Sequence, residues 1–125
     1  ISFTNIDKEI ATFSKFWLQD ILRNKMGFTG TIFSDDLSMK GSDYVGGIEA
    51  KVAKALESGC NMVLICNDRP AAIEAINFLE KEKISQSQKV TKLKASESIS
   101  WADLENDARR IDIIDKLNFI EKLKL

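Results

Sequence analysis

Two adjacent carboxylates, Asp35 and Asp36, follow a short apolar run after a single serine, Ser34, and are the first candidates for chemistry in this chain. The run, Ile32-Phe33, is expected to belong to a buried strand, and a buried strand does not normally finish in paired acids. A carboxylate at the C-terminal end of a parallel strand lies where open α/β sheets and (β/α) barrels build their active sites. Asp35 could therefore act as a nucleophile, a base or a metal ligand.

The absence of histidine and the placement of the two cysteines limit the kinds of catalysis and metal binding that this chain can support. The chain has no histidine, the commonest general acid or base near neutral pH, so acid–base chemistry within these residues falls to Asp, Glu, Lys, Tyr or Cys. Its two cysteines, Cys60 and Cys66, match no zinc-binding spacing. We expect both thiols to be reduced and buried, as is usual in a cytoplasmic protein.

The composition describes an ordinary globular domain. Apolar residues make up 44% and charged residues 30% of the chain, and the formal net charge is −1. This near-neutral balance gives no reason to expect nucleic acid or an anionic membrane as a partner. No signal peptide opens the chain, and no apolar run approaches the roughly 18 residues of a membrane span. We therefore expect a cytoplasmic location and no membrane insertion.

The elements that must position the acids begin with a helix and a strand. Apolar spacing predicts a helix from about Lys15–Asn24, with Ser14 as its N-cap and Gly27 as its stop. A strand over Thr31–Ser34 follows. Residues 35–47 are expected to form a loop after the strand, with or without one turn of helix, so Asp35 is expected just beyond the strand end.

The same order of elements continues downstream. The sequence predicts a helix over Ile48–Ser58, a continuously apolar strand over Met62–Cys66, a helix from Pro70 to about Glu82, and a last helix from about Ala102 to Leu123. Strands that alternate with helices indicate parallel strands joined by right-handed crossovers. Two parallel strands cannot close a sheet, so the pattern fits the closing part of a larger α/β architecture.

Several short segments of the chain carry a family resemblance. They are Ala11-Thr12-Phe13-Ser14, Trp17-Leu18, Ile21-Leu22-Arg23, Gly27-Phe28-x-Gly30, Phe33-Ser34-Asp35-Asp36-Leu37-Ser38-Met39-x-Gly41 and Ala55-Leu56-x-x-Gly59-Cys60-x-Met62-Val63-Leu64. Together they resemble the glycoside hydrolase family 3 β-N-acetylhexosaminidases, above all the bacterial peptidoglycan-recycling type. The similarity is dense from about Thr12 to Pro70 and thinner toward Leu125.

This resemblance implies a fold and an activity. Residues 1–125 would form the C-terminal part of a single (β/α)8 TIM-type barrel domain, with β/α units over 1–82 and a C-terminal helical tail over 83–125. The implied activity is that of a retaining hydrolase, which releases terminal N-acetylglucosamine from peptidoglycan-derived muropeptides during cell-wall recycling. The implied partner is the carbohydrate substrate, and no cofactor or metal is implied.

The resemblance also implies roles for individual residues. Asp35 matches the catalytic nucleophile of the family, and Met39 matches a residue that lines the sugar site. A retaining glycosidase needs such a carboxylate to attack the anomeric carbon and form a glycosyl-enzyme that water later hydrolyses. Asp36 is expected to point elsewhere and to orient the loop or accept backbone hydrogen bonds.

One departure from the family pattern concerns the proton donor. In this family type a His–Asp pair on a mobile loop protonates the leaving group, and it lies upstream of the matched region. This chain has no histidine, so the acid/base and most sugar-binding residues are expected outside it. We therefore expect the isolated chain to be inactive, although its parent protein is a hydrolase, and the missing N-terminal half of the barrel becomes a possible partner.

Other interpretations of the same residues stay open. Asp35 could be a turn residue after a strand, and Asn67 and Asp68 are better explained as helix caps than as ligands. The whole chain could be an inactive remnant, or a half-barrel that needs a partner chain and exposes apolar faces without it. A third alternative is an acidic module that binds Mg²⁺, which would need a further acid where the sequence has Asn67.

Overall fold

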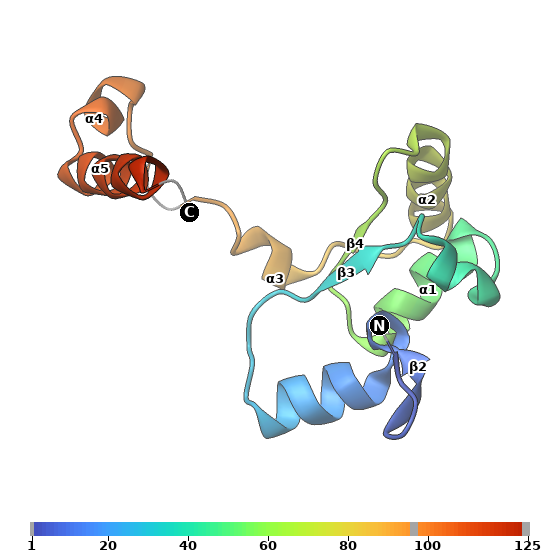
Figure 1. Cartoon of the computed structure of the whole chain (residues 1–125). Helices are drawn as coiled ribbons and strands as arrows, with labels where there is room; N and C mark the ends of the chain where they lie inside the picture. The colour runs from blue at the N-terminus through green and yellow to red at the C-terminus, as the bar shows by residue number, and fades with distance from the viewer. Residues whose placement is uncertain (1, 96–97, 124–125) are drawn as a thin grey trace. The chain divides into compact units, whose positions relative to one another are not determined.

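The computed structural model describes residues 2–95 and 98–123 and separates the chain into two compact units, Ile1–Lys94 and Ala95–Leu125 (Figure 1). The first unit contains a pair of parallel strands with helices packed against it, and the second contains two helices. The expected α/β class is therefore confirmed for the first unit. All residues that the sequence singles out for chemistry belong to it.

The first unit opens with an antiparallel hairpin of β1 (Ser2–Phe3) and β2 (Asp7–Ile10), followed by a 3₁₀ turn, η1 (Ala11–Phe13). A helix, η2 (Phe16–Lys25), comes next, as predicted to within one residue at each end. Its hydrogen bonding is of the wider π type, however, with the Met26 amide donating to the carbonyl of Ile21 over 2.9 Å. The sequence predicted only that a helix would form here.

Both predicted ends of this helix are confirmed. The Ser14 hydroxyl accepts a hydrogen bond from the Trp17 amide over 3.0 Å, which satisfies one of the amide donors left over at a helix N-terminus. Gly27 follows the helix with a φ of 67°, a left-handed conformation that favours glycine. The chain then turns toward the strand that carries the acids.

The two central strands are β3 (Phe33–Asp36) and β4 (Met62–Leu64), which pair in parallel with Phe33 opposite Met62 and Asp36 opposite Leu64. The predicted bounds of the first strand, Thr31–Ser34, were wrong by two residues, because both acids belong to the strand itself. The predicted second strand was too long at its C-terminal end.

The expectation of fully buried strands was also wrong. The side chain of Phe33 is 44% exposed and its partner Met62 is exposed too, whereas Ser34 is buried. In the part of the chain that the structure describes, the sheet holding this pair has no third strand. The apolar residues Phe33 and Met62 at the start of the two strands therefore remain partly exposed.

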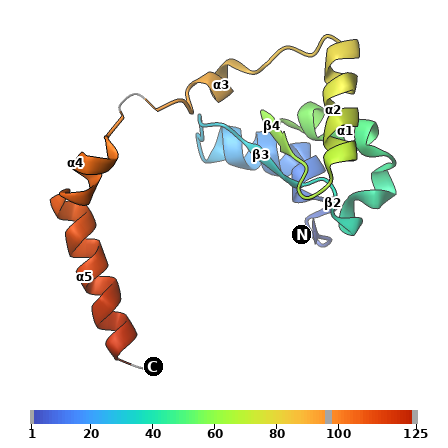
Figure 2. The same cartoon turned by 90° about the horizontal axis from the view of Figure 1, so that it is seen from above.

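Two helices pack beside the strand pair, α1 (Ile48–Ser58) and α2 (Arg69–Lys81), and they lie next to each other in both views (Figures 1 and 2). The bounds of α1 are those predicted, and Gly59 ends it with a φ of 123°. Asp68 caps α2 by accepting a hydrogen bond from the Ala71 amide over 3.0 Å, which confirms its expected capping role. The core of the unit is apolar and consists of Phe13, Leu18, Ile32, Leu37, Ile48, Val52, Ala55, Cys60 and Ala75.

A short helix, α3 (Gln88–Thr91), closes the first unit, and the second unit contains α4 (Trp101–Glu105) and α5 (Ala108–Lys122). The prediction of one helix from Ala102 to Leu123 was wrong, because the helix is interrupted at Asn106-Asp107. Asp107 accepts a hydrogen bond from the Arg110 amide over 2.8 Å and so begins a new helix, the role that Asp prefers over a helix interior.

The second unit buries little of its apolar surface. Trp101, the first residue of α4, is 82% exposed. Among the described residues, no helix combines the length and apolar character needed to cross a membrane.

Candidate active site

A pocket of about 70 Å³ lies at the C-terminal end of β3. Three segments of the first unit contribute to it: the end of the hairpin with η1, the end of β3, and the loop that follows. The lining residues are Ile10, Thr12, Phe13, Asp35, Asp36, Leu37, Met39, Gly41 and Ser42. The structure thus brings Asp35 and Met39, the two site residues named from the sequence, to the same pocket.

Asp35 is exposed at this pocket and is held through its backbone. Its amide donates a hydrogen bond to the Thr12 hydroxyl over 3.2 Å, and its carboxylate Oδ1 accepts one from the Asp36 amide over 2.9 Å. The Ser34 hydroxyl, on the buried side of the strand, donates to the Asp35 carbonyl over 2.7 Å. The main chain is therefore fixed on both sides of a carboxylate that remains open to solvent.

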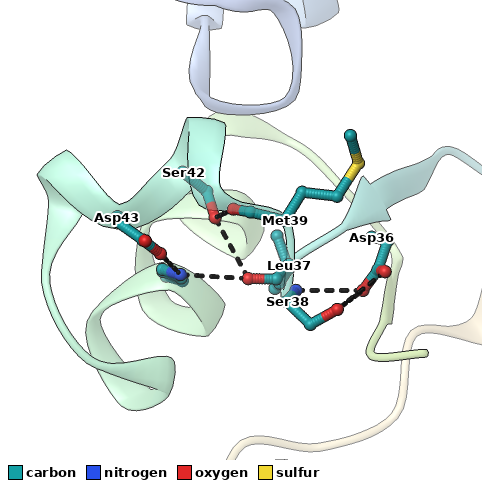
Figure 3. Close-up of polar contacts among 7 residues, drawn as sticks. Asp36, Leu37, Ser38, Met39, Ser42 and Asp43 are labelled. Atoms are coloured by element: carbon teal, nitrogen blue, oxygen red, sulfur yellow. Dashed lines mark hydrogen bonds and ion pairs between the residues drawn. The ribbon is translucent and has the colours of Figure 1, made fainter. Parts of the chain in front are cut away.

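Asp36 is engaged in a different way. Its Oδ1 accepts a hydrogen bond from the Ser38 amide over 2.9 Å, and the Ser38 hydroxyl donates to both of its oxygens (Figure 3). The same Oδ1 accepts a further hydrogen bond from the Cys66 amide over 3.0 Å. These bonds, led by the one from the Ser38 amide, hold the pKa of Asp36 below its ordinary value. Of the two roles expected for Asp36, the acceptance of backbone hydrogen bonds is confirmed.

The loop after Asp36, which contains the expected turn of helix as the 3₁₀ helix η3 (Lys40–Val45), is anchored at Leu37. This residue is fully buried, and its amide donates to the Leu64 carbonyl over 2.9 Å. Its own carbonyl accepts from the Ser42 hydroxyl over 3.0 Å and from Lys51 Nζ over 3.1 Å. The same ammonium group forms an ion pair with Asp43 over 2.7 Å, so one lysine joins the start of the loop to η3 (Figure 3, where the lysine is drawn without a label).

The opposite wall of the pocket is anchored by α1 and by the hairpin. The Ser58 hydroxyl donates to the Phe13 carbonyl over 2.8 Å. The Ser14 hydroxyl donates to the carboxylate of Asp7, and this bond is the main reason that the pKa of Asp7 is lowered. Thr12, whose hydroxyl accepts the hydrogen bond from the Asp35 amide, lies in the chain between Asp7 and Phe13, which these bonds hold.

Sequence reasoning missed the roles of three residues, Thr12, Lys51 and Ser58. Thr12 lies in a segment that carried the family resemblance, but no role was assigned to it. Lys51 and Ser58 could have been noticed because they occupy the same helical face as the apolar Val52 and Ala55. A polar side chain on such a face needs a partner, and the sequence alone does not show which one.

The two cysteines differ. Cys60 is buried, as expected, and burial raises the pKa of its thiol to about 11. Cys66 is exposed at the end of β4, so the expectation that both are buried was wrong. Across residues 2–95 and 98–123, no three His, Cys, Asp or Glu side chains lie close enough together to hold a metal ion.

A pocket bordered by an exposed acid lies at the end of a parallel strand, and the similarity of the chain to known proteins identifies its family. Residues 1–111 match the glycosyl hydrolase family 3 N-terminal domain, so the chain belongs to this family. The resemblance noted in the sequence is thereby confirmed.

Individual relatives agree with this assignment. The chain is 34% identical over 127 residues to a Beta-hexosaminidase of Mannheimia succiniciproducens. The aligned region covers 98% of this chain and 37% of that protein. It is 40% identical over 111 residues to a Beta-hexosaminidase of Idiomarina loihiensis, covering 87% of this chain and 34% of that protein. The chain therefore spans about a third of the length of these relatives.

A solved structure shares the fold. NagZ from Neisseria gonorrhoeae, in complex with N-trifluoroacetyl-D-glucosamine, superposes with a TM-score of 0.59 and 34% identity. The match covers 77% of this chain and 27% of that one. This complex shows that a structurally similar protein holds a glucosamine derivative.

Proposed function

We propose that this chain is the C-terminal part of a (β/α)8 barrel that acts as a retaining β-N-acetylhexosaminidase, with Asp35 as its nucleophile. The observation that carries the proposal is the contrast between the two neighbouring acids. Asp36 uses both oxygens to bind the loop and β4, whereas the Asp35 carboxylate is exposed at the pocket. Only the second arrangement leaves a carboxylate accessible to an anomeric carbon.

The reaction proposed for Asp35 follows from this placement. Its carboxylate oxygen would form a bond to the anomeric carbon as the bond to the leaving-group oxygen breaks. Water would then hydrolyse the glycosyl-enzyme and release the sugar with retained configuration. The fixed backbone on both sides of Asp35 supports this role, because a nucleophile must be held in position to be effective.

Met39 is proposed to line the sugar site. It lies on the loop after β3, is 53% exposed and borders the same pocket as Asp35. An unbranched thioether packs well against the apolar face of a ring and adapts to its shape. The names of the relatives and the glucosamine derivative in the Neisseria complex support an N-acetylglucosaminide as substrate.

The remainder of the protein is proposed to supply the acid/base, most of the sugar-binding groups and the other strands of the barrel. The absence of histidine from this chain supports that division, as does the share of the relatives that it covers. We further propose that the substrates are muropeptide fragments of peptidoglycan and that the protein works in the cytoplasm. By itself, the chain would bind a sugar weakly and hydrolyse nothing.

The test uses this chain joined to the upstream region of the Mannheimia succiniciproducens Beta-hexosaminidase, called the joined protein below. It should release 4-nitrophenol from 4-nitrophenyl N-acetyl-β-glucosaminide, and the isolated chain should not. Asp35→Gly should lower kcat by about 10⁴-fold or more, as expected for loss of a covalent nucleophile. Asp36→Asn serves as the neighbouring control and should retain far more activity than Asp35→Gly.

Azide identifies which role Asp35 plays. In Asp35→Gly, azide can enter the space left by the carboxylate and attack the anomeric carbon opposite the nitrophenolate, which leaves without needing a proton. The product should be the α-glycosyl azide, and the rate should rise with azide concentration. Formation of the β-glycosyl azide would instead assign Asp35 to the acid/base side, and an inactive joined protein with native-like structure would count against the proposed activity.

A further inference from the structure

Helix α1 carries two buried polar side chains on a face that is otherwise apolar. Lys51 and Ser58 are 6% and 2% exposed, and they share this face with Ile48, Val52 and Ala55. Lysine is rarely buried, and a buried ammonium group is costly unless it is paired and hydrogen-bonded. A lysine buried at this position therefore needs binding partners, and those partners indicate what it does.

Both polar side chains bind the main chain of the pocket. Lys51 Nζ donates to the carbonyl of Leu37 over 3.1 Å, and the Ser58 hydroxyl donates to the carbonyl of Phe13 over 2.8 Å. Leu37 and Phe13 belong to two different segments that line the pocket with Asp35. One helix thus supports the pocket from behind at two separate points.

The contacts of Lys51 are arranged around the loop that follows the acids. Its ammonium group meets Leu37 at the start of the loop and Asp43 at the far end, over 2.7 Å (Figure 3). Ser42 adds a second donor to the Leu37 carbonyl and also donates to the carbonyl of Met39 over 2.7 Å. Because Met39 lies between the two anchored ends, the position of its side chain depends on these bonds.

We infer that Lys51 is a positioning residue, which holds the loop from Leu37 to Asp43 so that Met39 stays beside Asp35. Its part in the reaction rests on the proposed function, but its effect on the loop does not. Lys51 touches no reacting atom and acts through Leu37 and Asp43. The experiment therefore measures the loop and the reaction separately.

The loop is measured in the 125-residue chain by amide hydrogen exchange. Lys51→Met keeps the apolar stem and removes the donor, and it should accelerate exchange at residues 38–43 by about 10-fold or more, with α2 unchanged. Lys116→Met is the matched control, because Lys116 forms an ion pair with Asp112 of the same 2.7 Å length at an exposed site. This variant should leave exchange at residues 38–43 unchanged.

A second variant protects the test against unfolding. If Lys51→Met unfolds the chain, Asp43→Asn replaces the exposed end of the ion pair without changing side-chain size. Faster exchange confined to residues 38–43 in Asp43→Asn would support the inference. Unchanged exchange at these residues in whichever variant folds would overturn it.

The reaction is measured in the joined protein. Lys51→Met should lower kcat/KM by about 10- to 100-fold, since a displacement of about 1 Å can cost as much, and Lys51→Arg should recover part of that loss. If Lys51 acts through the loop, the effects of Lys51→Met and Met39→Ala on kcat/KM should be less than additive. Full additivity would overturn the link to Met39.

The two measurements separate the two proposals. Faster loop exchange in Lys51→Met together with an inactive joined protein would sink the proposed function and leave the positioning of the loop in place. An active joined protein whose kcat/KM is unaffected by Lys51→Met would support the proposed function and overturn the part of Lys51 in the reaction.

Discussion

The backbone amide of Cys66 donates a hydrogen bond to Oδ1 of Asp36 over 3.0 Å, so a side chain at the end of β3 binds the segment that follows β4. Regular pairing has ended by this point, since β4 stops at Leu64. Asp36 continues the connection between the two chain segments and also binds Ser38 on its own side. These hydrogen bonds restrain the main chain next to Asp35.

This relationship predicts a pH dependence of stability. Because the pKa of Asp36 is lower in the folded chain than the value of about 3.9 expected when unfolded, its ionised form stabilises the fold above about pH 4. That contribution is lost as the pH falls through the lowered pKa. Urea denaturation should show Asp36→Asn to be less stable than the wild-type chain at pH 6, with a smaller difference at pH 3.

The exposed Asp20→Asn on η2 is the control for this measurement, and it should change the urea midpoint little at either pH. An Asp36→Asn variant whose deficit is the same at pH 6 and pH 3 would contradict the assignment of these bonds to the ionised carboxylate.

The two cysteines should react at very different rates. The Cys60 thiol has its pKa raised to about 11 by burial, so at pH 8 only about one molecule in 10³ carries the thiolate that reacts. Cys66 is exposed. Iodoacetamide at pH 8, followed by peptide mass mapping, should label Cys66 first and Cys60 only on unfolding, and rapid labelling of a Cys66→Ser variant would contradict the burial of Cys60.

Gly59, which ends α1, should not tolerate a side chain. Its φ is 123°, and a Cβ atom there would lie 1.9 Å from the Gln19 side-chain nitrogen. Because Gln19 can move, the backbone strain dominates, and Gly59→Ala should cost about 1–3 kcal/mol of unfolding free energy. Gly41→Ala is the control, since a Cβ there meets nothing within 4 Å, and equal effects of the two changes on the urea midpoint would be inconsistent with the strain argument.

The exposed pair Phe33 and Met62 should bind a hydrophobic dye. These side chains face each other at the start of the parallel strands and are exposed in the first unit. The isolated chain should therefore enhance the fluorescence of anilinonaphthalene sulfonate, and a Phe33→Thr, Met62→Thr variant should enhance it less. The joined protein should bind less dye than the chain does, and a wild-type chain that binds none would argue against an uncovered strand pair.

The sequence was a good guide where local signals agreed. The bounds of α1 were predicted to the residue, because apolar spacing and the following Gly59 point to the same element. Local signals failed at Asn106-Asp107, where the apolar pattern continues while Asp107 caps a new helix. Propensity for a cap outweighed periodicity there.

The candidate site was predicted only in part, for a physical reason. Asp35 was proposed because it lies at the end of a short apolar run, and Met39 because its segment resembles that of a known family. The roles of Lys51 and Ser58 depend on carbonyl groups that lie 14 and 45 residues away in the sequence. No local pattern reveals such an acceptor, because every residue has a carbonyl and only the folded chain shows which one is near.

The support that α1 gives to the pocket has a consequence for how the pocket can change. Both of its polar side chains bind carbonyl oxygens of the main chain, and a carbonyl is present whatever side chain the residue bears. The side chains that border the cavity can therefore be exchanged while the frame that holds them stays in place. A protein built this way can acquire a preference for a different ligand through substitutions on the pocket surface, without rebuilding its scaffold.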